Sequence, residues 1–112
     1  MTYKPYVSQT VGEHLDFLAH MMLAAPTFED KTGYLRRMNI DTTFISLNEG
    51  MQVIHERLGE ERYKKLRVMS DKMRSLFEPD PEDKTGDTQA GRMLVGEMRD
   101  ILTSAAKRKA SQ

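Results

Sequence analysis

The stretch IDTTFISLNEGMQVIHERLG, residues 40–59, carries the clearest structural signal in the chain. Its large apolar side chains follow one another at steps of 4, 3, 4, 3 and 4 residues: Ile40, Phe44, Leu47, Met51, Ile54 and Leu58. Because an α-helix completes a turn about every 3.6 residues, this spacing places them on one face. It predicts a helix over residues 40–58, capped at its start by Asn39 or Asp41 and ended by Gly59.

Three further segments carry an apolar stripe with helical spacing. Thr10 and Glu13 form a capping-box pattern, and Pro26 cannot continue a helix, which together predict a helix over residues 10–25. A second helix is expected over residues 60–77 and a third over residues 87–107. The expected face of the 10–25 helix is Val11, Leu15, Leu18, Met22 and Ala25, and that of the 87–107 helix is Ala90, Leu94, Met98, Ile101 and Ala105.

Helices that each bear one apolar stripe must bury those stripes against one another. No stretch shows the alternation of apolar and polar residues that is typical of a strand. We therefore predict an all-α fold, a single-domain antiparallel helical bundle of about four helices over residues 1–112. Residues 1–9 would form a short lead-in, and residues 108–112 a frayed C-terminal tail.

The pentapeptide EDKTG occurs twice, at residues 29–33 and 82–86. DKTG also opens the phosphorylation motif of P-type ion pumps, but there it follows a buried strand, whereas TFE and DPE precede it here. We interpret both copies as loops at helix starts, in which the Thr accepts hydrogen bonds from free N–H groups and the Gly permits a turn. The second copy belongs to an acidic linker, residues 78–87.

Charge and composition restrict the class of protein. The 112-residue chain has 17 basic and 17 acidic side chains and no cysteine. The lack of cysteine excludes disulfides and thiolate metal sites. Neither a signal peptide nor an apolar run of about 18 residues is present, so we expect a cytoplasmic protein without membrane association.

A metal or small-ligand site is one alternative function. The histidines are His14, His20 and His55. Steps of three and four residues place Glu13, Asp16 and His20 on one helical face, and with His55 they are the candidate ligands. The Glu-x-x-His motif of di-iron bundles is missing, because no Glu stands three residues before His20 or His55. A solvated polar face is the favoured interpretation, and no cofactor is expected.

Nucleic-acid binding is a further alternative. Residues 60–77 carry Arg62, Lys64, Lys65, Arg67, Lys72 and Arg74, and residues 107–109 add a basic cluster. Together they could form a basic patch. Acidic residues are interleaved with them, however, the chain has no net positive charge, and no aromatic stacking platform accompanies them. Nucleic acid is therefore a disfavoured partner.

Apolar side chains beyond the main stripes give the strongest functional signal. Phe17 and Met21 lie beside the expected face of the 10–25 helix, and Val95 and Leu102 beside that of the 87–107 helix. The chain is also rich in methionine, with nine, a residue that suits adaptable binding surfaces. We take these four residues as candidates for an interaction surface.

No nucleophile with a partnered base, phosphate-binding loop or complete metal set is present in the sequence. We therefore predict a small non-enzymatic helical protein that acts through protein–protein interaction, as a regulator, adaptor or immunity-type inhibitor. Its partner would be another protein or a second copy of the chain in a homodimer.

Overall fold

The part of the chain that the structure describes contains five helices, joined by loops, and no strand. The structure is a computed structural model that describes residues 7–29 and 39–110. The helices are α1 (Val11–Ala24), α2 (Ile40–Val53), α3 (His55–Leu58), α4 (Glu60–Phe77) and α5 (Asp87–Ala110). The predicted all-α fold is confirmed.

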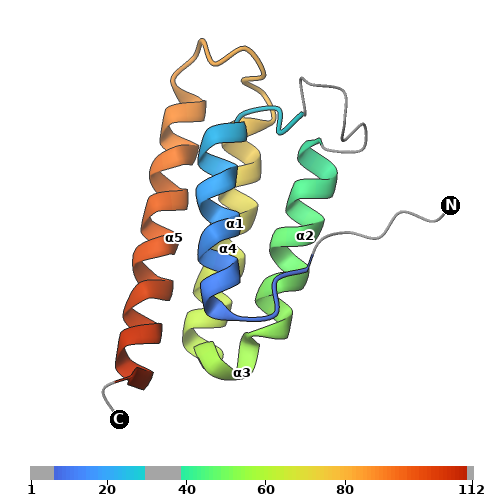
Figure 1. Cartoon of the computed structure of the whole chain (residues 1–112). Coiled ribbons are helices and arrows are strands. Elements are labelled where there is room, and N and C mark those ends of the chain that lie inside the picture. The colour runs from blue at the N-terminus through green and yellow to red at the C-terminus, as the bar shows by residue number, and fades with distance from the viewer. Residues whose placement is uncertain (1–6, 30–38, 111–112) are drawn as a thin grey trace, which may run out of the picture.

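The four long helices run alternately up and down and pack side by side (Figure 1). α4 contacts α2 and α5, and α1 contacts the same two helices. The short α3 lies at the bottom of the view, where it joins α2 to α4 (Figure 1). Each long helix therefore has two long neighbours, as in an antiparallel four-helix bundle.

Local hydrogen bonds determine where α1 and α2 begin. Thr10 Oγ1 accepts a hydrogen bond from the Glu13 N–H at 3.1 Å, and Glu13 Oε1 accepts one from the Gln9 N–H at 3.3 Å. Asn39 Oδ1 accepts from the Thr42 N–H, and Thr42 Oγ1 accepts from the Asn39 N–H, both at 3.0 Å. These bonds satisfy N–H groups that have no partner inside the helix. The cap of α2 is therefore Asn39.

The predicted continuous helix over residues 40–58 is wrong in one respect, because the structure interrupts it at Ile54. This residue has φ −95° and ψ 12°, and α3 then continues to Leu58, where Gly59 with φ 84° leads into α4. The side chains of Ile54 and Leu58 remain buried, so the apolar face survives the change of direction. The chain has to reverse before α4 begins, and the interruption is part of that reversal.

The core is formed by the predicted face of α2 and the helices around it. Phe44, Leu47 and Met51 are buried. Just after α1, Phe28 makes edge-to-face contacts with Phe44 and Phe77 at ring-centroid distances of 5.9 and 5.2 Å. Such T-shaped pairs are favourable beyond the area that they bury. This aromatic cluster joins the end of α1 to α2 and α4.

The buried face of α5 is rotated relative to the sequence prediction. Val95, Met98 and Leu102 are fully buried, whereas Leu94 and Ile101 are only partly buried. α5 contacts both α1 and α4, so it buries an arc wider than one stripe. The centre of the buried face is therefore displaced by about one residue around the helix from the apolar stripe predicted from the sequence.

A line of side-chain pairs joins α2 to α4. The pairs are Gln52 with Tyr63, Asn48 with Ser70, and Asp41 with Arg74. The hydroxyls of Tyr63 and Ser70 donate at 2.6 and 2.7 Å. Because hydrogen bonds depend steeply on distance and angle, this line favours one register of α2 against α4.

Candidate functional site

Three of the four residues predicted to form an interaction surface lie in the core. Met21, Val95 and Leu102 are fully buried, and Phe17 is partly buried against the core. The apolar side chains beyond the main stripes are buried within the bundle, because α1 and α5 each pack against two long helices. Met21, Val95 and Leu102 therefore cannot contact a partner of the folded chain.

The four candidate metal ligands do not come together. Glu13, Asp16 and His20 are exposed on α1. His55 lies in α3, where its Nε2 is 2.8 Å from Oε2 of Glu60. Among the described residues, no group of three or more His, Cys, Asp or Glu side chains is arranged to hold a metal ion.

Four of the basic side chains of α4 interact with groups of the chain itself, including Lys64, whose Nζ lies 3.9 Å from Oε1 of Glu60. Arg62 donates to the backbone carbonyl of Leu58 at 3.0 Å, and Arg67 donates to the hydroxyl of Tyr63 at 3.1 Å. Arg74 forms ion pairs with two carboxylates. The predicted contribution of residues 107–109 to a basic patch lies outside the described side chains.

The acidic linker is an ordered loop built around the buried side chain of Asp80. Its carboxylate accepts hydrogen bonds from the N–H groups of Lys84, Thr85 and Thr88 at 2.8, 3.1 and 3.0 Å. Burial by itself would raise the pKa of Asp80. The three N–H donors outweigh burial and hold the pKa well below its ordinary value. Asp80 therefore organises the loop as a carboxylate.

The roles predicted for the Thr and Gly of EDKTG are found in its second copy. Thr85 Oγ1 accepts a hydrogen bond from the Asp87 N–H at 3.2 Å, and Gly86 has φ 92°. Residues 30–33 of the first copy lie outside the described residues. The sequence did not single out Asp80, because the spacing of the loop does not distinguish it from the other acids.

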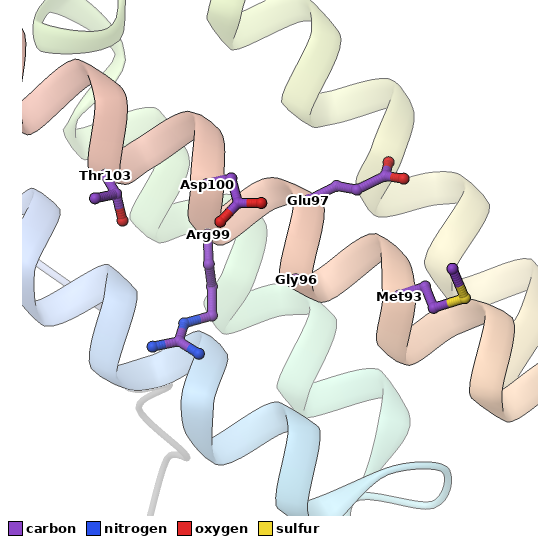
Figure 2. A pocket seen from close by; sticks show the side chains of 6 residues that line it. All are labelled: Met93, Gly96, Glu97, Arg99, Asp100 and Thr103. Carbon is purple, nitrogen blue, oxygen red and sulfur yellow. The ribbon is translucent and has the colours of Figure 1, made fainter.

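The outer face of α5 carries an open depression of about 440 Å³ (Figure 2). It is lined by Met93, Gly96, Glu97, Arg99, Asp100 and Thr103. A Cβ built at Gly96 would lie 3.5 Å from Met22 Cε, which is an ordinary contact distance. Close packing therefore does not require a glycine at position 96, and the missing side chain leaves open space there.

The side chains around Gly96 extend in different directions. Arg99 extends toward α1, whereas Glu97 and Met93 extend toward α4 (Figure 2). Met93 is 63% exposed. Glu97, Arg99 and Asp100 form no ion pair with another described residue. The depression thus offers an apolar thioether, an unfilled gap and carboxylates that are free to pair.

None of the helices in the described ranges is both long enough and apolar enough to cross a membrane. Comparison of the chain with protein-family models, with curated proteins and with solved structures finds no match.

Proposed function

We propose that this protein is a non-enzymatic interaction protein that binds a helix of a partner protein on the outer face of α5. The depression at Gly96, beside the exposed thioether of Met93, supports this proposal. A side chain of the partner helix would enter the gap, as a knob enters the hole between residues of a facing helix. Met93 would adjust around it, because methionine is flexible and polarisable.

The charges of the surface indicate the chemistry of the partner. Glu97 and Asp100 are three residues apart and therefore neighbours on the surface of α5. Arg99 extends away from them toward α1 (Figure 2). A Lys or Arg of the partner helix would pair with these carboxylates and orient the complex. The partner helix is accordingly amphipathic, with an apolar side chain at its centre and basic residues beside it.

Two glycine variants test the site. Gly96→Leu fills the depression from within. Gly12→Leu is the matched control, because Gly12 is an exposed helical glycine whose added Cβ would meet only Thr10 Oγ1, at 3.9 Å. Proteins captured by the wild type would be identified by mass spectrometry, purified and titrated against all three forms. We expect Gly96→Leu to weaken binding by about tenfold or more, about 1.4 kcal/mol, and Gly12→Leu to bind as the wild type does.

The carboxylates of the site can be tested separately. The double variant Glu97→Lys, Asp100→Lys should weaken binding and reverse its dependence on salt. Binding that is equal in Gly96→Leu and wild type would contradict the site. A complex that tolerates the double lysine variant would contradict the basic partner. If the wild type sediments as a dimer and Gly96→Leu as a monomer, the occupant of the site is a second copy of the chain. A wild type that is strictly monomeric and captures no protein would contradict the proposal as a whole.

A further inference from the structure

His14 is enclosed at the beginning of α1, together with Ser8 and Gly50. His14 and Ser8 are both fully buried. A Cβ built at Gly50 would lie 2.7 Å from His14 Nδ1 and 3.3 Å from Ser8 Cβ, and the first of these distances is too short for a real contact. Both side chains thus pack against the same point of α2, and Ser8 is the residue of the 7–10 segment that this contact places against the bundle.

The polar atoms of this cluster are buried without being paired. Neither ring nitrogen of His14 nor Oγ of Ser8 has a hydrogen-bond partner among the described residues. A buried cation without a partner is costly, so the site accepts the imidazole only in its neutral form. Burial lowers the pKa of His14 from 6.5 to about 4.

Charged groups on the surrounding elements do not relieve this cost. Residues 7–10 contain no titratable side chain. Glu13 and Asp16 on α1 are exposed, as is Glu49 on α2. Arg99 of α5 extends toward α1 (Figure 2), but it is not among the causes of the shift. Burial is the one cause of the lowered pKa.

We propose that residues 7–10 form an acid-released latch, in which protonation of His14 frees Ser8 from Gly50 and separates the segment from α2. Above pH 6.5 the imidazole is neutral whether the latch is closed or open, so the closed form is favoured fully. As the pH falls from 6.5 toward 4, the open form binds a proton and the closed form does not. The ratio of open to closed molecules then rises by up to about tenfold per pH unit, and by about 80-fold between pH 6.5 and pH 4.

Hydrogen exchange on the full chain tests the latch. The N–H of Glu13 donates to Thr10 Oγ1, and that of His14 donates to the Thr10 carbonyl at 3.0 Å, so both amides report on this end of α1. After correction for intrinsic exchange, we expect their protection to fall about 50-fold between pH 7 and 4.5 in the wild type. His14→Gln cannot take up the proton and should lose this dependence on pH.

The matched control is His20→Gln, which removes an exposed histidine from the same helix and should keep the wild-type behaviour. Gly50→Ala should open the latch at neutral pH, because the added Cβ displaces the imidazole. Protection in the wild type that does not change with pH, or the same change in His14→Gln, would overturn the proposal. If His14→Gln does not fold, the wild type decides: loss of protection at the two amides that follows the NMR titration of the His14 ring supports the latch, and a ring midpoint near 6.5 excludes it.

Discussion

Two glycines of α5 differ in what an added side chain would meet. A Cβ built at Gly91 would lie 2.5 Å from Phe77 Cε1, inside the aromatic cluster, whereas at Gly96 it would meet only Met22 Cε at 3.5 Å. Gly91→Ala should lower the free energy of unfolding by about 1–3 kcal/mol, because the ring of Phe77 must move. Gly96→Ala should raise it by up to about 1 kcal/mol, because alanine favours the helix. Urea denaturation followed by circular dichroism measures both, and a stabilising Gly91→Ala would contradict the packing of α5 on Phe77.

A similar contrast exists on α2 between Leu47 and Ile45. Leu47 is fully buried, whereas Ile45 is 46% exposed. Leu47→Asp should lower the free energy of unfolding by more than about 3 kcal/mol, because it buries a carboxylate without a partner. Ile45→Asp should cost less than about 1 kcal/mol, since its carboxylate can reach water. Similar losses in the two variants would show that the assigned face of α2 is wrong.

At the level of elements, Asp80 connects the acidic linker to the beginning of α5. Asp80→Asn keeps the size of the side chain but presents an amide nitrogen to one of the three N–H donors, so we expect the melting temperature to fall by several degrees at pH 7. Asp83→Asn is the control. Asp83 is exposed, has φ 55°, which asparagine tolerates, and pairs with Arg92 at 3.2 Å. Its replacement should change the melting temperature little.

The stabilisation by Asp80 should also depend on pH in a defined direction. Hydrogen bonds to its carboxylate hold the pKa in the folded protein below the value of about 4 that is usual for an unfolded chain. The stabilisation is therefore complete above that pH and is lost as the pH falls further. The difference in melting temperature between wild type and Asp80→Asn should be constant from pH 7 to about 5 and should shrink below about 4. A constant difference down to pH 2 would contradict this role.

The sequence predicts helix limits better than helix faces. Thr10 and Gly59 carry signals that act locally, through a side-chain cap and a left-handed backbone, and both are found where they were expected. The interruption at Ile54 has no such signal, because the reversal toward α4 determines it. The buried arc of α5, centred on Val95, depends on which two helices flank α5, and spacing within one helix does not contain that information.

The candidate site was less predictable for a related reason. A gap at Gly96 is defined by a missing side chain, and the charges around it, such as Glu97, resemble any solvated helix surface in the sequence. The buried pair of Ser8 and His14 was also not foreseen, since it depends on the approach of Gly50 from another helix. Sites that arise from contacts between elements leave little periodic signal.

Across the whole molecule, α4 is held by two kinds of contact. Its side toward α2 carries directional pairs such as Ser70 with Asn48 and Tyr63 with Gln52. At its C-terminal end, Phe77 packs on Gly91 of α5 and on Phe28 through van der Waals contacts without hydrogen bonds. The polar side therefore favours one register, and the apolar side supplies most of the burial.

The position of Phe28 between the rings of Phe44 and Phe77 has a practical consequence. Phe28 is fully buried, so truncation to alanine should cost about 3–5 kcal/mol and leave a dry hollow with aromatic walls. Benzene dissolved in the buffer would fit such a hollow and should restore part of the lost melting temperature of Phe28→Ala, while leaving the wild type unchanged. A single truncation would thus turn this protein into one whose folding is controlled by an added small molecule.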